Sequence, residues 1–207
     1  MSDAQPTVVI IDDDPDIRRA LQGLLETVDL RASLFSTAAE FLASKRPQGP
    51  CCIVVDVRLP GLSGLDFQQE LLRTNVPFPI IFITGYGDIP MSVRAMKSGA
   101  VEFLTKPLHH QNFLEAIQAG LRRDCARLED ERRVGDLRTC HETLTPRERE
   151  VMALLVSGRV NKQIAAAIGI SEVTVRLHRS QIMRKMRATS LTDLVRISDR
   201  LNASQAG

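Results

Sequence analysis

Short apolar runs alternate with helical patterns over the first 120 residues of the chain. Five runs of four to six residues, at positions 8–11, 32–35, 52–55, 79–84 and 101–105, have the length of buried strands. Between them, apolar residues recur at helical spacing, as in Ile17, Leu21 and Leu24. Continuously apolar strands separated by helices are typical of a parallel sheet covered on both faces. The pattern therefore predicts an α/β, doubly wound, parallel five-stranded domain over residues 1–122.

The pattern changes twice in the second half of the chain. Residues 120–142 are charged and balanced in sign, which predicts a solvated helical linker over 123–140 rather than an autonomous coiled coil. Helical spacing of apolar residues then returns in four short segments. Their predicted N-caps are Thr145, Asn161, Ser171 and Ser190, with Pro146 in a first turn and Gly169 ending the second helix. This predicts a small all-α domain over residues 141–207.

Composition limits the cellular context. Of the 207 residues, 43% are hydrophobic and 25% charged, so each half can bury a core. We find neither an apolar run of membrane-spanning length nor a signal-peptide pattern, and we expect a cytoplasmic protein without a membrane partner. The four cysteines lack metal-binding spacing. We interpret them as reduced apolar or surface residues, with redox sensing as the less favoured alternative.

Charge is divided unevenly along the chain. Residues 1–120 carry a net charge of −4, residues 121–143 a net charge of 0, and residues 144–207 a net charge of +6. A basic C-terminal half indicates a polyanionic partner for that half alone. All aromatic residues lie at or before Phe113, so the basic half has no ring on which an unpaired base could stack. This favours double-stranded over single-stranded nucleic acid.

Polar residues with complementary chemistry follow four of the predicted strands. Asp12 and Asp13 follow the first strand, Asp56 the third, Thr84 the fourth and Lys106 the fifth. Strand ends of a doubly wound sheet converge on one edge. Three carboxylates there need a counter-charge, which Mg²⁺ and the lysine can supply while binding phosphoryl oxygens. Each residue alone has an ordinary structural explanation, but together they predict phosphoryl transfer to a carboxylate. Asp14 and Asp16 are explained by helix capping.

The first half resembles the receiver domain of two-component response regulators over about residues 6–122, in the segments IIDDDPDIRRAL, VVDVRLPGLSGLDF, FITGYGDIPMSVRAMKSGAVEF and LTKP. The resemblance implies that Asp56 accepts a phosphoryl group from a sensor histidine kinase. It implies direct Mg²⁺ ligation by Asp13, Asp56 and the backbone carbonyl of Arg58, with Asp12 acting through water.

The same resemblance assigns residues that sense the phosphoryl group. Thr84 and Lys106 would contact its oxygens, a cis peptide would precede Pro107, and Phe103 occupies the position of the aromatic switch. Tyr86 departs from the histidine common in the nearest relatives. A rival interpretation, an aspartyl-phosphate phosphatase of the haloacid dehalogenase type, leaves Asp56 without a role and lacks an acidic pair after Lys106.

The basic half has the pattern of a helix-turn-helix. The third predicted helix of this half places Val175, His178, Ile182 and Met186 on its core side, which leaves its arginines outward. Such a helix fits a major groove. Lys162, Thr174, Arg179 and Lys185 are the candidate phosphate contacts. A helical bundle with a solvated basic face is the alternative.

A second resemblance favours DNA binding. LTPREREVMALLVSGRVNKQIAAAIGISEVTVRLHRSQIMRKM is similar to the LuxR/NarL type of helix-turn-helix, and the whole chain resembles a FixJ-type regulator. The resemblance implies base contacts by Arg176, Leu177 and Ser180. A LuxR-type quorum sensor would share this half but needs a ligand pocket in front of it. We expect a transcription factor rather than an enzyme, which dimerises when phosphorylated and binds promoter DNA, with RNA polymerase as a further candidate partner.

Overall fold

The computed structural model describes residues 5–74 and 78–204. The chain forms two compact units, residues 1–128 and 129–207, and each is described by itself. The division falls inside one long helix, α5 (His110–Glu142), so the charged segment predicted as a linker is the continuation of this helix. Within the described ranges no helix combines the length and apolarity that a membrane span requires.

The first unit is built on one parallel sheet. Its strands are β1 (Thr7–Ile11), β2 (Arg31–Phe35), β3 (Cys51–Asp56), β4 (Ile80–Thr84) and β5 (Glu102–Thr105). They lie in the order β2-β1-β3-β4-β5, every neighbouring pair is parallel, and Ile11 of β1 lies opposite both Phe35 and Val55. The predicted doubly wound fold is confirmed, with strand ends within one residue of those expected.

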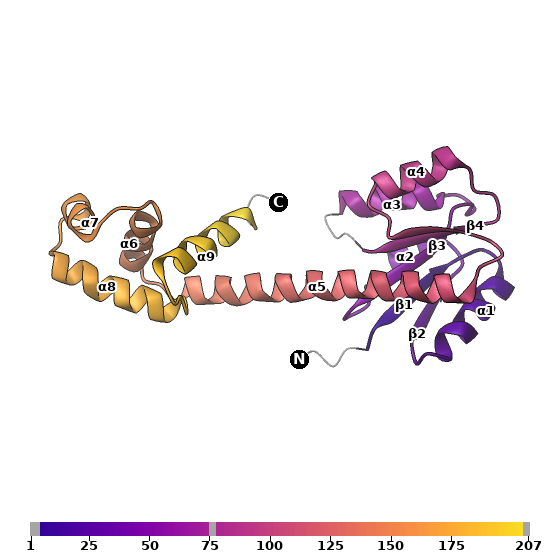
Figure 1. Cartoon of the computed structure of the whole chain (residues 1–207), viewed down its shortest axis with the longest axis horizontal. Helices are drawn as coiled ribbons and strands as arrows, with labels where there is room; N and C mark the ends of the chain where they lie inside the picture. Colours follow the sequence, from indigo (N-terminus) through magenta and orange to yellow (C-terminus); the bar gives the residue numbers. More distant parts are fainter. Residues whose placement is uncertain (1–4, 75–77, 205–207) are drawn as a thin grey trace. The chain divides into compact units, whose positions relative to one another are not determined.

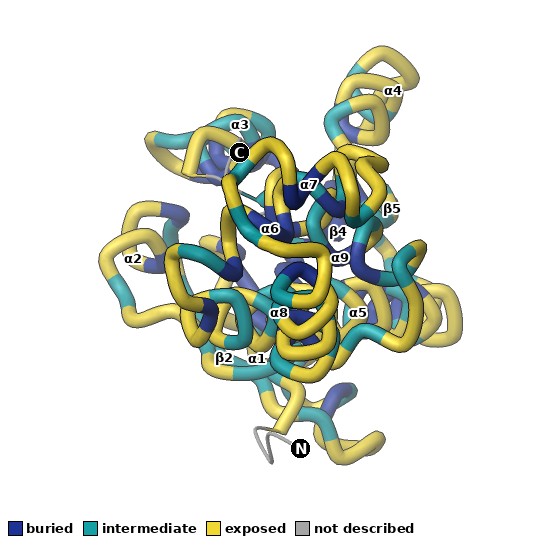
Figure 2. Tube along the Cα trace, turned by 90° about the vertical axis from the view of Figure 1, so that its left-hand side faces the viewer, coloured by how far each residue is buried: buried dark blue, intermediate teal, exposed yellow. Residues whose placement is uncertain are grey.

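Helices cover both faces of this sheet (Figure 1). The helices before α5 are α1 (Pro15–Glu26), α2 (Ala38–Ala43), α3 (Gly64–Arg73) and α4 (Ile89–Lys97). Side chains alternate across a strand, so Val9 and Ile11 pack with α2, α3 and α4, whereas Val8 and Ile10 pack with α1 and α5. The helix α4 buries only Ala95, and most of its residues are exposed (Figure 2).

Side-chain caps set where these helices begin. The side chains of Asp14, Thr37, Ser63 and Asp88 each accept a backbone N–H of the first turn. Such caps satisfy donors that have no partner within the helix. The acid-rich segment after β1 is therefore divided by function, because Asp14 caps α1 while Asp12 and Asp13 remain at the sheet edge.

The helix α5 is fixed to the sheet by a close approach and a buried carboxylate. A Cβ at Gly120 would lie 2.4 Å from the sulfur of Cys52, so only glycine lets the helix pack this closely. One turn later, Asp124 accepts the N–H of Cys51 at 2.8 Å and pairs with the Nε of Arg127 at 2.7 Å. Asp124 is 1% exposed. These contacts hold α5 to the first unit as far as its middle.

The second unit is an all-α bundle around one apolar core. Its helices are α6 (Pro146–Val156), α7 (Asn161–Ile168), α8 (Glu172–Lys185) and α9 (Leu191–Ala203). Caps by Thr145, Ser171 and Ser190 are confirmed, as is the left-handed Gly169 that ends α7. The prediction that Asn161 caps α7 is wrong. Val160 is the N-cap, and Gln163 accepts its N–H at 3.1 Å in place of a cap side chain.

Candidate functional site

The carboxyl ends of the strands gather the predicted reactive residues of the first unit. Asp12 follows β1, Asp56 ends β3, Thr84 ends β4 and Lys106 follows β5. The N–H of Lys106 donates to the carbonyl of Thr84 at 2.8 Å, which ties the last two strand ends together. The Lys106–Pro107 peptide is cis, as the resemblance implied.

One ammonium group joins the two buried acids of this edge. The Nζ of Lys106 lies 2.8 Å from Oδ2 of Asp12 and 2.6 Å from Oδ2 of Asp56. The second oxygen of each acid accepts a backbone N–H at 2.9 Å, from Asp14 and from Arg58 respectively. Asp12 is fully buried and Asp56 is 7% exposed. The Asp56 carboxylate is thus held in one orientation and keeps a small exposed edge.

Burial and charge shift two pKa values in this pocket. Burial raises the pKa of the Asp12 carboxyl, and the hydrogen bonds from Lys106 and Asp14 offset only part of that effect. Burial of Lys106 lowers its pKa, but its hydrogen bonds to Asp12 and Asp56 outweigh this effect, so its pKa is raised. Lys106 therefore stays an ammonium at neutral pH and supplies part of the counter-charge that the three carboxylates need.

The donor set fits a hard divalent cation. Carboxylate oxygens of Asp12, Asp13 and Asp56 lie within 4.8 Å of one another, and Asp13 is exposed. Mg²⁺ prefers one or two carboxylates together with water, which this half-open arrangement allows.

The loop after β4 lies between Thr84 and the ring of Phe103 on β5. Thr84 is fully buried and its Oγ1 accepts the N–H of Tyr86 at 3.2 Å. Phe103 packs against Phe82 with ring centroids 6.2 Å apart. A Cβ at Gly87 would lie 2.8 Å from the Phe103 ring, so the glycine lets the loop after β4 pass beside it.

Other supporting residues had no signal of their own in the sequence. Arg18 donates from its guanidinium to the backbone carbonyl of Asp12. At Gly64, a Cβ would lie 2.4 Å from the carbonyl oxygen of Asp56, so α3 can begin directly beside the end of β3. This close approach becomes apparent only when the sheet and α3 are packed.

In the second unit, α8 presents the predicted base-contacting residues to solvent. Arg176, Leu177 and Ser180 are exposed, and Val175 and Ile182 are buried on the opposite side. Of the predicted phosphate contacts, Lys162 is exposed and Thr174 and Arg179 are half-buried. The hydroxyl of Thr174 lies 2.9 Å from that of Ser171 at the start of the helix.

Lys185 forms an ion pair within the second unit. Its Nζ lies 2.6 Å from Oε2 of Glu148, which is 4% exposed, and 3.1 Å from the carbonyl of Thr143. Glu148 neutralises this charge within the unit, and the phosphate contact of Lys185 stays a prediction. No pattern in the sequence indicated Glu148 as its partner.

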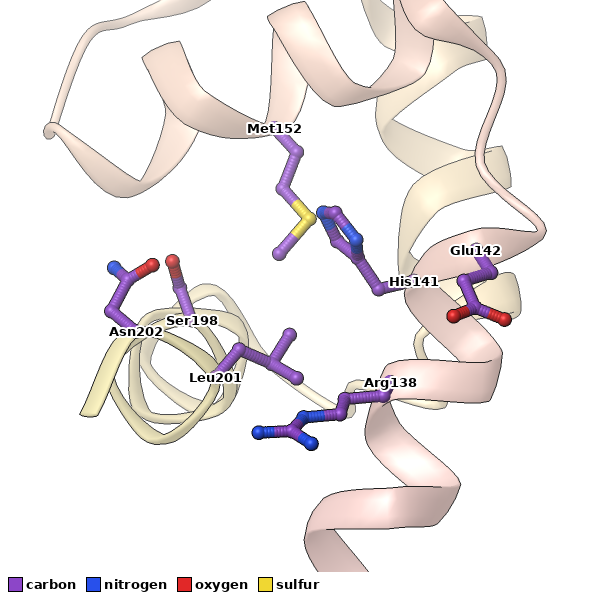
Figure 3. Close-up of a pocket in the computed structure, with 7 residues that line it drawn as sticks. All are labelled: Arg138, His141, Glu142, Met152, Ser198, Leu201 and Asn202. Carbon is purple, nitrogen blue, oxygen red and sulfur yellow. The ribbon is translucent and has the colours of Figure 1, made fainter. Parts of the chain in front are cut away.

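A cavity of about 280 Å³ lies between α5, α6 and α9 of the second unit (Figure 3). Arg138 and His141 of α5 face Met152 and Leu201 across it. The guanidinium of Arg138 already donates to the carbonyl and hydroxyl of Ser204, at 2.6 and 3.0 Å. None of the predicted DNA-contacting residues lines this cavity, and we assign it no ligand.

Comparison with known families matches both units. Residues 8–118 match the response regulator receiver domain, and residues 142–198 match the bacterial regulatory proteins of the luxR family. The chain belongs to the response regulators. It is a transcription regulator of a two-component system with a receiver domain and a LuxR-type DNA-binding domain, as predicted, and its named relatives are regulators rather than enzymes.

Similar proteins span almost the whole chain. Nodulation protein W of Bradyrhizobium diazoefficiens is 51% identical over 95% of this chain and 87% of its own length. Response regulator protein TodT of Pseudomonas putida is 42% identical over 99% and 90%, and transcriptional regulatory protein FixJ of B. diazoefficiens is 38% identical over 93% and 94%.

Two solved structures match almost the whole chain. The response regulator StyR has 43% identity and a TM-score of 0.82, with 95% of this chain and all of that chain covered. Full-length FixJ from B. japonicum has 37% identity and a TM-score of 0.57, with 95% and 97% covered. A receiver domain implies a histidine kinase as partner, and the luxR-family domain implies DNA. Receiver domains generally bind Mg²⁺ in such an acidic pocket.

Proposed function

We propose that Asp56 is the phosphoryl acceptor of this response regulator and that its phosphorylation promotes dimerisation and sequence-specific DNA binding. The observation that carries the proposal is the single ammonium of Lys106 held between Asp12 and Asp56, at 2.8 and 2.6 Å. An oxygen of Asp56 attacks the phosphorus of a kinase phosphohistidine. The P–O bond forms as the P–N bond breaks, and the imidazole nitrogen keeps the electron pair.

Each neighbouring residue has a role in this transfer. Mg²⁺, held by Asp13, Asp56 and the carbonyl of Arg58, with Asp12 acting through water, would neutralise charge on the transferred group. Lys106 would move its charge to a phosphoryl oxygen, since its present partner oxygen on Asp56 is the one that a phosphoryl group can occupy. The hydroxyl group of Thr84 would donate a hydrogen bond to a further phosphoryl oxygen. The ring of Phe103 would change position together with Thr84.

Labelling with a small phosphodonor tests the acceptor. We expect one phosphoryl group on Asp56, found by mass spectrometry of the trapped phosphoprotein, and none on an Asp56→Asn variant. Chelation of divalent cations should abolish labelling of the wild type, because three carboxylates within 4.8 Å would otherwise repel the incoming anion. Full labelling of Asp56→Asn, or undiminished labelling in chelator, would contradict the proposal.

For the DNA-binding domain, we propose that α8 enters the major groove, with Arg176, Leu177 and Ser180 at base edges. Lys162, Thr174 and Arg179 would then contact phosphates. The net charge of +6 on residues 144–207 and the outward exposure of the three base-contacting residues support this. RNA polymerase is a further predicted partner.

Two substitutions separate base reading from phosphate binding. Arg176→Ala should cost about 1–3 kcal/mol on the preferred duplex and relax preference at one base pair. Lys162→Ala should weaken binding to preferred and scrambled duplexes alike and lower the salt slope by about one unit. A titration of both duplexes at several salt concentrations decides between the roles. If Arg176→Ala weakens both duplexes equally, Arg176 is a phosphate contact instead.

A further inference from the structure

The outward face of α8 carries an aliphatic residue that the proposed DNA contacts do not include. Val175, Ile182 and Met186 are fully buried and mark the core side of this helix. At about 100° per residue, Val173 and Leu177 point almost directly away from that side, one turn apart. They are 58% and 63% exposed, among the most exposed large apolar residues of the second unit. The same outward line continues to Ser180 and Arg184, which are also exposed.

The fold of the second unit does not explain why Val173 is apolar. It lies outside the apolar core of its domain, and the cap at the start of α8 is made by Ser171 and Thr174. Valine is also a poorer helix former than alanine, because its branched side chain loses rotamers in a helix. An exposed, branched apolar residue at the second position of α8 therefore suggests contact with a partner of this helix.

We propose that Val173 is a further specificity-determining residue, which contacts the methyl group of a thymine. Leu177, one turn later on the same face, would contact the methyl group of a neighbouring thymine. This rests on the proposed entry of α8 into the major groove. The N-terminal residues of a recognition helix are those that meet base edges, and Val173 lies in the first turn. The C5-methyl of thymine is the one apolar group that a base pair presents in that groove. Arg176 is exposed on the flank of the same stripe. Its positive charge fits polyanionic DNA at least as well as it fits an acidic or apolar protein surface.

Replacing thymine by deoxyuridine removes the methyl group and leaves every hydrogen bond in place. Duplexes are first selected from a random pool with the phosphorylated full-length chain, and each thymine of the preferred duplex is then replaced singly by deoxyuridine. We expect wild-type affinity to fall about fourfold at the thymine that Val173 reads, as for loss of one buried methyl group. Val173→Ala should bind the thymine and deoxyuridine duplexes equally at that position, and Val173→Ile should restore the preference.

Controls separate this reading from general effects. Leu177→Ala should lose the thymine preference at a neighbouring position. Val28→Ala, a matched truncation of a residue that is 42% exposed in the receiver domain, should change nothing.

If Val173→Ala keeps the wild-type response to deoxyuridine at every position, or if the wild type shows no such response, the inference is wrong. If Val173→Ala weakens selected and scrambled duplexes equally, Val173 touches the backbone or another protein, and the inference also fails. A wild-type chain that prefers no duplex over a scrambled one would instead overturn the proposed function.

Discussion

Glu148 and Lys185 are 37 residues apart in the sequence and form a 2.6 Å ion pair in the DNA-binding domain. Glu148 also accepts the N–H of Thr145 at 2.7 Å, while its own N–H donates to the hydroxyl of Thr145. One carboxylate thus completes the cap of α6 and fixes the last turn of α8. The orientation of α8 depends on a residue that has no contact with DNA in our proposal.

The pKa of Glu148 is lowered, chiefly by its hydrogen bond from Lys185. A carboxylate with a lower pKa in the folded than in the unfolded state stabilises the fold above its unfolded pKa, and this contribution is lost as the pH falls through the folded value. We expect Glu148→Gln to lower the free energy of unfolding by about 1–3 kcal/mol at pH 7. The difference from wild type should shrink below a pH of about 4. Denaturant unfolding across pH checks this, and a difference that is constant down to pH 3 would contradict it.

Single residues were predictable where their chemistry was local. Asp56, Thr84 and Lys106 follow apolar runs, so strand periodicity alone placed them on one edge. The partner of Lys185 could not be predicted in this way, because an ion pair between α6 and α8 exists only after the helices pack. Asn161 shows the limit at a cap: an amide favours the position before a helix, but the chain starts the helix one residue earlier and uses Gln163 instead.

At the scale of elements, α5 joins two environments in one continuous helix. Sequence patterning predicted its first turns as part of the receiver domain and its charged part as a linker, because the faint heptad of apolar residues decays after Glu129. The structure shows no break in the helix, and a solvated helical segment needs no apolar stripe when both of its ends are packed. Two glycines inside this helix have opposite surroundings and allow a matched test.

Gly120 faces the sheet, and Gly135 has nothing within 4 Å of the place where a Cβ would stand. Gly120→Ala should destabilise the receiver domain by about 1–3 kcal/mol, because the methyl group would overlap the sulfur of Cys52. Gly135→Ala should stabilise its part of the helix by up to about 1 kcal/mol. Chemical denaturation of the full chain gives both values. Equal effects from the two substitutions would mean that α5 does not pack on β3 as described.

At the scale of the whole molecule, the proposed signal is a change in oligomeric state. The helix α4 exposes Ile89, Val93 and Met96 by 80%, 44% and 43%, in positions one turn apart. We propose that this face, with β5 and the start of α5, pairs two phosphorylated receiver domains. Dimers would then bind paired half-sites on DNA.

Lys106 should connect phosphorylation to this pairing. In Lys106→Ala, a small phosphodonor should still label a fraction of Asp56. The labelled protein should sediment as a monomer, because it has no ammonium group that can move to a phosphoryl oxygen and change the dimer face. Lys45→Ala removes an exposed lysine elsewhere in the receiver domain and should dimerise like the wild type. Dimerisation of labelled Lys106→Ala to the wild-type extent would show that the lysine has no part in the switch.

The contact between α5 and the sheet also protects one thiol. Burial raises the pKa of Cys52, so its sulfur is not a thiolate at neutral pH. Cys52 lies directly beneath Gly120, whereas the side chain of Cys51 packs on the other face of the sheet. The Cys52 thiol can therefore meet an alkylating reagent only after α5 lifts from β3. Its alkylation rate, followed at this one residue by mass spectrometry, reports how often this helix opens, and the same measurement with and without phosphorylation would time the mobility of α5 without an engineered cysteine.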